Sequence, residues 1–421
     1  MEKHNIEAFV RYFESGCKPE GVGAAGMELE HFIVRAVDAK LMSYDGMHGV
    51  EMLLREIAGT FQEQEEIQNH LLGLHNDRYA LSLEPAAQLE ISVIPDKEIR
   101  KTACRYEQFL STVKPLLKEW GYELAYAGYL PSGRAEEQRL IPKQRYTYMD
   151  AYFAQIGDFG RCMMRGTASV QVSVDYKDEE DFVNIYRAAV SMGPLLALLT
   201  DNACMFEDRH WEKHMVRTYI WDRVDDKRCG IVPGTFEEGF GFRAYADYLY
   251  HVPQIFQEAE DGSVYPTTAS LSELCQDKPV TREQMEHAVS IVFPDVRLKT
   301  YVEIRVADSM PPVYAFAYLA LIKGLFANRS KLSELYEEFE KYTHGGHMTE
   351  EAVKKGKEQL IRNGYEGEIY GRKAVYWLER MGATAVSQLP VEEQELIRPL
   401  LVLAEQHKSV KNVTGKEGDR S

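Results

Sequence analysis

The chain has 421 residues, of which 45% are hydrophobic and 27% are charged. This is the balance of an ordinary globular protein, long enough to bury one large core or two modest ones. The 66 acidic and 49 basic residues give a formal net charge of -17. That charge argues against a nucleic-acid partner, because phosphate backbones are bound by clustered positive charge. Small anionic substrates need only a few local cations and remain compatible with it.

The N-terminus and the cysteines bear on location. The first residues, MEKHNIEAFVRYF, include acidic side chains and no long apolar run, so we expect no signal peptide. The most apolar stretch, 188–199, is too short to span a bilayer, so we expect no membrane partner. The six cysteines are scattered without a CxxC pair or a Cys/His cluster, which disfavours structural zinc and a disulfide framework. We therefore expect a cytoplasmic protein.

Helices and strands follow one another irregularly in the first third of the chain. Hydrophobic periodicity predicts helices at 5–16, 48–64 and 98–120. It also predicts a strand at 27–34 and two short strands within 79–94 that meet at Glu84-Pro85. Gly16 and Gly121 are placed to end the first and last of these helices.

The clearest strand is predicted at 166–176, where Val170, Val172 and Val174 alternate with polar residues. A helix is expected at 178–200 and one further strand at 296–307. From about residue 313 the pattern is helical, including 331–342, 349–362, 372–381 and 391–407. We expect one catalytic domain over 1–405, followed by a polar, disordered tail over 406–421.

This irregular order favours an α+β fold over the regular βαβ alternation of a doubly wound sheet. The sequence contains neither a GxGxxG motif after a predicted strand nor GxxxxGK[ST]. The common nucleotide-binding loops are therefore not used.

Polar side chains share one face in each of four predicted strands, and aliphatic side chains occupy the other face. The polar sets are Glu28 with Glu30, then Gln88 with Glu90 and Ser92, then Gln171 with Ser173, and finally Glu303 with Arg305. A solvated sheet face would explain any one set. Acid-rich faces that converge would repel one another unless a cation lay between them.

A hard divalent cation with oxygen ligands is the natural partner for such a group. Two or three magnesium ions could engage the carboxylates of Glu28, Glu30, Glu84, Glu90 and Glu303. Magnesium usually completes its coordination with substrate phosphates, so this pattern indicates a nucleotide-phosphate reaction. Arg305, beside Glu303 on the same face, is then placed to neutralise a transferring phosphoryl group.

Seven blocks of sequence carry a resemblance to a known family. They are GMELEHF, SLEPAAQLEIS, PKQRYTYM, GTASVQVSVDY, RTYIWDRVDDKRCGIVPGTF, GFRAYADYLYHVPQIF and FPDVRLKTYVEIRVADSMPP. In this order they resemble the plant-type glutamate–cysteine ligases of the glutamine-synthetase-like superfamily. The resemblance runs from about residue 15 to residue 325.

The resemblance implies a curved antiparallel sheet that forms a funnel, with helices outside and ATP at one end. It implies that glutamate is activated by ATP as a γ-glutamyl phosphate and then joined to the amine of cysteine. By position, the same five glutamates would be the metal ligands, and Arg305 and Glu84 would be catalytic. Gln171, Ser173, Arg145 and Arg217 would face the substrates, and Arg217 would hold glutamate. The group that takes the proton from the amine stays open between Asp175 and Glu84.

Two segments depart from the family pattern. The LEPGGQ-type turn is here Leu83-Glu-Pro-Ala-Ala-Gln88, and residues 306–312 lack the pair of arginines that relatives have after the Glu303–Arg305 strand. Two alternatives therefore stay open. One is a ligase of the same mechanism with another amine acceptor, and the other is a phosphotransferase resembling the guanidino kinases.

Overall fold

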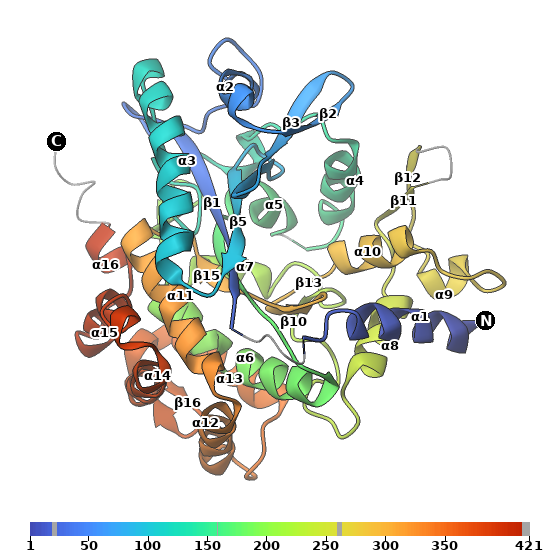
Figure 1. Cartoon of the computed structure of the whole chain (residues 1–421), viewed down its shortest axis with the longest axis vertical. Coiled ribbons are helices and arrows are strands. Elements are labelled where there is room, and N and C mark those ends of the chain that lie inside the picture. The colour runs from blue at the N-terminus through green and yellow to red at the C-terminus, as the bar shows by residue number, and fades with distance from the viewer. Residues whose placement is uncertain (19–22, 158, 259–262, 415–421) are drawn as a thin grey trace.

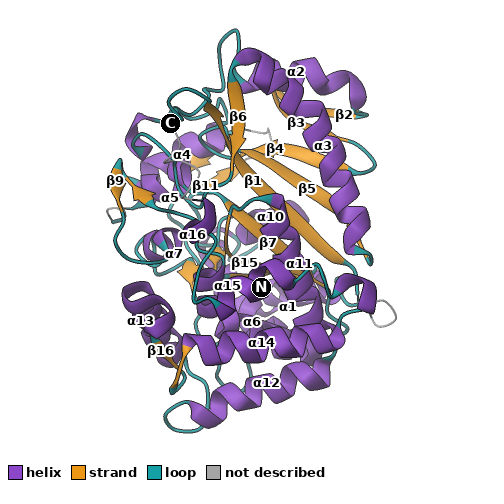
Figure 2. Cartoon of the chain, turned by 90° about the vertical axis from the view of Figure 1, so that its left-hand side faces the viewer, coloured by secondary structure: helices purple, strands orange, loops and turns teal. Residues whose placement is uncertain are grey.

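The computed structural model describes residues 1–18, 23–157, 159–258 and 263–414 (Figure 1). Its centre is a nine-stranded antiparallel sheet in the order β14-β15-β7-β1-β5-β4-β3-β2, with β6 paired to the end of β1. The strands are β1 Ala25–Arg35, β2 Glu63–Ile67, β3 His70–His75, β4 Tyr79–Leu83, β5 Leu89–Asp96, β6 Tyr122–Ala125, β7 Ser169–Val174, β14 Val296–Leu298 and β15 Val302–Asp308. Figure 2 shows β1, β5, β4 and β7 running side by side through the molecule.

The two faces of this sheet have different partners. In β1 the side chains of Glu28 and Glu30 lie on one face, and the alternation places Leu29 and His31 on the other. His31 stacks on Tyr106 of the long helix α3, Ile99–Trp120, and its Nε2 atom lies 2.7 Å from the Tyr106 hydroxyl. The aliphatic face is therefore the packed face, and the carboxylates point away from it.

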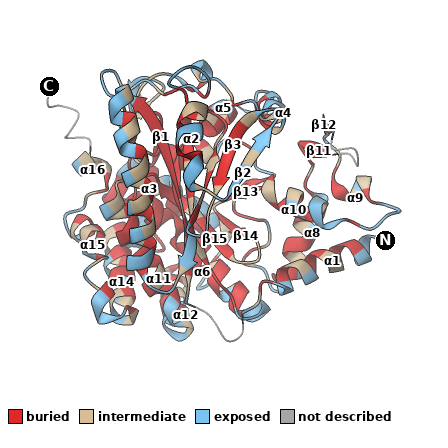
Figure 3. Ribbon diagram, turned by 45° about the horizontal axis from the view of Figure 1, so that its top comes forward, coloured by how far each residue is buried: buried red, intermediate tan, exposed pale blue. Residues whose placement is uncertain are grey.

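Three long helices cover the packed face. Helix α3 packs on β5 and β6, helix α11 (Pro312–Ala327) on β7, and helix α6 (Glu179–Leu199) on β15. The remaining C-terminal helices are α12 Arg329–Tyr342, α13 Glu350–Asn363, α14 Ala374–Gln388, α15 Arg398–Glu405 and α16 Lys411–Thr414. They pack against α6 and α11, as the orange and red ribbons of Figure 1 show. Figure 3 shows that the strands are largely buried, whereas α3 and α12 expose their outer sides.

Most of the shorter helices surround the other face. They are α1 Glu2–Glu14, α4 Gln144–Phe153, α5 Gly160–Gly166, α7 Val216–Trp221, α8 Phe242–His251, α9 Leu271–Leu274 and α10 Arg282–Ser290. Helix α2, Val50–Ile57, instead packs on β3 and α3. Four small two-stranded sheets complete the fold: β8 Met205–Phe206 with β9 Arg209–His210, β10 Cys229–Gly230 with β13 Phe293–Pro294, β11 Phe256–Glu258 with β12 Val264–Pro266, and β16 Glu368–Ile369 with β17 Arg372–Lys373, which lies between α13 and α14. The α1 helix packs on α8, far from the C-terminal helices in Figure 1.

Helix α6 is long and apolar. By length and composition it is the one described helix that could cross a membrane, but 83% of its apolar window is buried inside the protein. This is the burial of a core helix, and α6 lies between the sheet and α12, α13 and α14. The buried hydrophobic residues form one continuous cluster from Ile6 to Val410.

Two sequence predictions differ from the structure in the strands. The strand expected over 296–307 is a hairpin, because the chain turns between β14 and β15, with the amide of Lys299 donating to the carbonyl of Tyr301. The helix expected over 48–64 ends at Ile57, and β2 follows as an edge strand on β3. The residues EQEEI of β2 have no apolar alternation, so pairing with β3 and not local pattern makes this segment a strand.

The disordered tail expected from residue 406 is wrong for residues 406–414. Val410 is fully buried, and the Ser409 hydroxyl donates to the Leu198 carbonyl at 2.6 Å. Composition predicted disorder here because most residues of the segment are polar, and the few residues that anchor it to the fold stand between them in the sequence. Residues 415–421 of the expected tail lie outside the described residues.

Candidate active site

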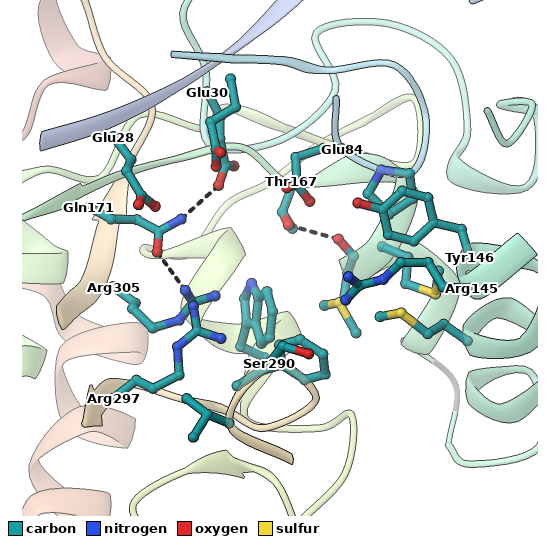
Figure 4. Close-up of a pocket in the computed structure, with 18 of the residues that line it drawn as sticks. Glu28, Glu30, Glu84, Arg145, Tyr146, Thr167, Gln171, Ser290, Arg297 and Arg305 are labelled. Carbon is teal, nitrogen blue, oxygen red and sulfur yellow. Dashed lines mark hydrogen bonds between the residues drawn. The ribbon is translucent and has the colours of Figure 1, made fainter. Parts of the chain in front are cut away.

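The carboxylate face of the sheet forms one wall of a cavity of about 420 Å³ (Figure 4). Residues of α4, α5, α7 and α10 complete the lining. The volume is in the range of small-ligand sites in proteins. All the residues predicted for the site line this cavity except Ser173, Asp175 and Glu303.

Three carboxylates converge in the cavity. Glu30 of β1 lies directly opposite Glu90 of β5 in the antiparallel register. Glu84 precedes β5 in the turn after β4, and one oxygen from each of these three residues lies within 4.8 Å of the other two. Like charges at directly opposed positions destabilise a sheet, so this arrangement costs stability that packing elsewhere must offset.

Hydrogen bonds fix the orientation of the central carboxylate. The Oε2 atom of Glu30 accepts from the Ser169 amide at 2.7 Å, and its Oε1 atom accepts from the Ser169 hydroxyl at 2.8 Å and from Gln171 Nε2 at 2.9 Å. The Ser82 hydroxyl likewise donates to Glu90 at 2.7 Å. These side chains are held in place before any ligand binds.

The carboxylates of the cavity are buried close to one another, and this raises their pKa values. Burial, reinforced by Glu30 and Glu90, raises the pKa of Glu84 to about 8. Burial, reinforced by Glu90 and Glu303, raises the pKa of Glu28 to about 7. Burial also raises the pKa values of Glu30 and Glu90 above the usual range. A bound divalent cation would reverse these shifts, because it stabilises the ionised carboxylates.

The turn that presents Glu84 is unusual in its backbone. The Glu84 carbonyl accepts from the Ala87 amide at 2.9 Å, and Ala87 has φ 65°, in the left-handed region that glycine adopts most easily. The Gln88 side chain accepts from the Ala86 amide and donates to the Thr167 carbonyl. The two alanines thus keep a tight turn, and Ala87 bears the strain at a position where glycine would fit without it.

A β-bulge turns Arg305 toward the cavity. The register between β15 and β7 slips between Ile304 and Ala307, so one extra residue is accommodated there. Arg305 Nη1 donates to Gln171 Oε1 at 2.5 Å and to Glu303 Oε2 at 2.9 Å. Figure 4 shows Arg305 and Arg297 on the side of the cavity below Glu28 and Gln171, facing the space between them and Glu84.

Glu303 does not join the carboxylate cluster. It is fully buried, its Oε2 atom accepts from Arg297 and Arg305, and its Oε1 atom accepts from Lys299 at 2.7 Å. Burial alone would raise the pKa of Glu303, but these three cations outweigh burial and hold it well below the usual range. Glu303 therefore does not lie among the carboxylates that converge as possible ion ligands. Both of its oxygens accept from basic side chains, and it orients those side chains.

Ser173 and Asp175 also lie away from the cavity. Ser173 pairs with Gly26 and Glu303 through the sheet at the rim, beyond Gln171 on the same strand. Asp175 forms an ion pair with Lys18 at 2.7 Å. The assignment of Ser173 to substrate binding stays a prediction, and of the residues of β7 Gln171 is the one that lines the cavity. Of the two candidate proton acceptors, Glu84 alone lines the cavity.

Three buried nitrogen atoms of the lining have no hydrogen-bond partner among the described residues: Nε of Arg145, Nε of Arg217 and Nε1 of Trp221. The Arg217 guanidinium lies over the Trp221 ring, 5.5 Å from its centroid, and only 5% of Arg217 is exposed. Buried donors without acceptors are rare in folded proteins, so these atoms indicate an anionic or carbonyl ligand.

Sequence reasoning missed three lining residues, Arg297, Lys299 and Trp221. Arg297 is the direct cross-strand partner of Glu303. The alternation of Arg297 and Lys299 in VRLK indicates that both side chains share one face of a strand. The sequence pattern predicts a single strand here, so it does not place these two residues against Glu303 across a hairpin.

The altered segment 306–312 does not reach the cavity. Ser309 donates to the Glu30 carbonyl at 2.6 Å from behind the sheet strand, and Asp308 accepts from the Asn202 amide at 2.8 Å. Met310 is buried, and none of 306–312 lines the carboxylate cavity.

The fold is thus α+β, with buried carboxylates on one face of an antiparallel sheet gathered opposite arginines, and with helices outside. The family model of glutamate–cysteine ligase family 2 (GCS2) matches residues 24–369, and the chain belongs to this family. The predicted fold class and enzyme class are thereby confirmed.

Individual relatives agree with this assignment. The chain is 28% identical to the chloroplastic glutamate–cysteine ligase of Brassica juncea over 91% of this chain and 80% of that one. It is 28% identical to the Arabidopsis thaliana enzyme over 91% and 78%. A crystal structure of glutamate–cysteine ligase from Francisella tularensis in complex with AMP has a TM-score of 0.58 at 9% identity, covering 95% of this chain and 86% of that one, which shows a shared fold.

These plant relatives are chloroplastic by name, which contradicts the cytoplasmic location expected from the sequence. Scattered cysteines indicate a reducing compartment, but they do not distinguish one such compartment from another.

Proposed function

We propose that the cavity joins the γ-carboxylate of glutamate to the amine of cysteine, with ATP as the source of energy. The observation that carries this proposal is the convergence of Glu30, Glu84 and Glu90 on one side of a cavity whose other side presents Arg305. Anionic ligands and cations can be gathered between these two groups. Family membership and the AMP bound to the Francisella structure support the use of ATP.

The carboxylate cluster suits magnesium. Its donors are all oxygen atoms, they lie within 4.8 Å of one another, and their pKa values are raised in a way that a cation would relieve. Glu30, Glu84 and Glu90 would hold one ion, and Glu28, which lines the same cavity, a second. When bound, magnesium would supply charge neutralisation for the ATP phosphates.

Arg217 is our candidate for the glutamate α-carboxylate, with the Trp221 indole as a second donor. Both have an unpartnered buried N–H group in the lining, and an arginine fork matches the geometry of a carboxylate. Arg145, unpartnered as well, would bind a second carboxylate or a phosphate. Its guanidinium lies 5.8 Å from the centroid of the Phe256 ring, which keeps it at the cavity wall.

The residues divide the chemistry into two steps. In the first, a γ-carboxylate oxygen of glutamate attacks the terminal phosphorus of ATP, the bond from that phosphorus to the bridging oxygen breaks, and ADP leaves. Arg305 stabilises the charge on the transferred phosphoryl oxygens. In the second, the amine nitrogen attacks the acyl phosphate carbon, the C–O bond to phosphate breaks, and the nitrogen loses a proton. Glu84 is the proposed proton acceptor, because it is the one of the two candidate carboxylates that lines the cavity.

We also propose that the described residues form a single catalytic domain, with a helical C-terminal part from about residue 313. The continuous hydrophobic cluster from Ile6 to Val410 supports this.

A panel of amines tests the proposed reaction. The protein is incubated with ATP, magnesium, glutamate and one amine, and both phosphate release and the amide product are measured. Cysteine should give a kcat/KM at least about tenfold above glycine or a diamine, and hydroxylamine should trap the acyl phosphate as a hydroxamate. Equal rates for all amines would remove cysteine as the acceptor. A phosphorylated guanidino compound formed without phosphate release would overturn the ligase reaction itself.

A further inference from the structure

The C-terminal segment Ser409–Thr414 docks directly behind the helix that carries Arg217. The Lys411 amide donates to the Asp201 carbonyl at 2.9 Å, and the Thr414 hydroxyl donates to Asn202 Oδ1 at 2.7 Å. The segment thus holds the Asp201–Asn202 turn, which follows α6. It lies beyond residue 369, where the match to the family model ends.

The central contact is a buried ion pair. Lys411 Nζ lies 2.7 Å from Asp201 Oδ2, and the two side chains are 10% and 0% exposed. Lys411 also donates to the Lys213 carbonyl at 3.0 Å. A fully buried carboxylate without a counter-ion is costly, and Lys411 supplies the counter-ion for Asp201 at this position.

Asp201 in turn fixes the start of α7. Its Oδ2 atom accepts from the Met215 amide at 2.8 Å, and Met215 has φ 58° and ψ 55°. A methionine in the left-handed region is strained and needs surrounding contacts to hold it there. Helix α7 begins at the next residue and directs Arg217 and Trp221 into the cavity.

We propose that Lys411 is a positioning residue for Arg217. The Lys411–Asp201 pair holds Met215 in its strained conformation, and Met215 sets the direction of α7 and so the place of the guanidinium that receives glutamate. This inference rests on the proposed function in one respect, the assignment of Arg217 to the glutamate carboxylate. Because Arg217 is assigned to glutamate, loss of Lys411 should weaken the binding of glutamate and not that of ATP.

The main test is Lys411→Met in the full-length protein, with separate titrations of glutamate and ATP. The KM for glutamate should rise about tenfold, while kcat and the KM for ATP change less than about twofold. Lys411→Arg should restore the KM for glutamate to within about threefold of the wild type. The matched control is Lys408→Met, next to this segment, because among the described residues Lys408 Nζ donates only to Gln406 and its loss should leave every constant unchanged.

A second variant covers the case in which Lys411→Met does not fold. In Asp201→Asn/Lys411→Met no lone charge is buried, and the amide oxygen can still accept from Met215. This double variant should have a KM for glutamate closer to the wild type than Lys411→Met, or should fold where the single variant does not. Equal impairment in the double variant would show that Lys411 does not act through Asp201.

The outcomes separate the inference from the function beneath it. A lower melting temperature with an unchanged KM for glutamate in Lys411→Met, or an equal rise in both KM values, would overturn the positioning role. Arg217→Lys is the reference variant. If it raises the KM for glutamate while Lys411→Met does not, the inference fails and the glutamate site stands. If Arg217→Lys leaves that KM unchanged, the glutamate site is misassigned and the inference falls with it.

Discussion

Glu30 and Glu90 occupy directly opposed positions on neighbouring antiparallel strands, with both carboxylates on the cavity side. A sheet selected for stability alone would not place two acids there. Their pKa values are both raised, first by burial. The site therefore holds a stability cost that a bound cation would relieve, and this coupling leads to the first prediction.

Glu90→Gln should separate activity from stability. Turnover should fall at least about 100-fold, because a magnesium ligand is lost. The free energy of unfolding in EDTA should rise by about 1 kcal/mol, because a like-charge pair is removed while Ser82 can still donate to the amide oxygen. Urea unfolding with and without magnesium, beside a phosphate-release assay, measures both quantities. Glu107→Gln makes the same change on the exposed side of α3 and should alter neither. A variant with wild-type turnover would contradict the ion assignment.

Arg305→Lys should reduce kcat about 100-fold with little change in the KM for ATP. A lysine ammonium has donors enough for the two contacts that Arg305 Nη1 makes with Gln171 and Glu303, but it cannot present a planar fork to the phosphoryl oxygens. Steady-state kinetics with varied ATP gives both constants. Arg78→Lys, at an exposed turn, is the control. Retention of more than about one third of wild-type kcat would exclude a role in phosphoryl transfer.

The two alanines of the Glu84 turn should respond differently to glycine. Ala87 has φ 65° and Ala86 does not have a positive φ, while both are buried. Glycine at 87 relieves left-handed strain of about 1–2 kcal/mol, which offsets the lost methyl packing and the added freedom of the unfolded chain. Glycine at 86 also loses methyl packing and adds freedom to the unfolded chain, but it relieves no left-handed strain. Ala87→Gly should therefore unfold with a free energy about 1–2 kcal/mol higher than Ala86→Gly, and equal values would show that the turn is unstrained.

His287 should make stability depend on pH. Burial lowers the pKa of His287 to about 4, and its Nε2 atom lies 2.8 Å from the Phe256 carbonyl, to which a neutral ring can donate. The unfolded chain, with a histidine pKa near 6.5, binds more protons between pH 6.5 and 4. Folding stability contributed by this group is therefore present above pH 6.5 and falls as the pH decreases toward 4, by about 3 kcal/mol in total.

His287→Leu isolates this contribution. It keeps an apolar contact with Phe256 but removes the titrating ring, so the difference in unfolding free energy between the wild type and the variant should shrink as the pH falls from 7 to 4.5. Urea unfolding at several pH values measures it, and the hydrogen bond lost in the variant cancels as a constant offset. A difference that stays constant with pH would mean that His287 titrates normally in the folded protein.

The sequence by itself determined the strands that carry the chemistry. Alternation in GMELEHF, AQLEISV and SVQVSVD placed Glu28, Glu30, Glu90 and Gln171 on one face each, and the structure brings all four to the cavity. Period-two patterns are local, so they can be read before the partner of each strand is known. Long helices such as α3 and α6 were predictable for the same reason.

Only the tertiary structure decided what surrounds each charge. Glu303 looked like another ligand in sequence, but the hairpin of β14 and β15 puts Arg297 and Lys299 against it. Ser173 shares a strand face with Gln171, but it lies further along β7 and does not line the cavity. The Lys411–Asp201 pair joins residues 210 positions apart, in a segment whose composition predicted disorder. Parity and composition describe a residue's own strand or segment, whereas counter-ions, bulges and docking contacts depend on which distant segments pack together.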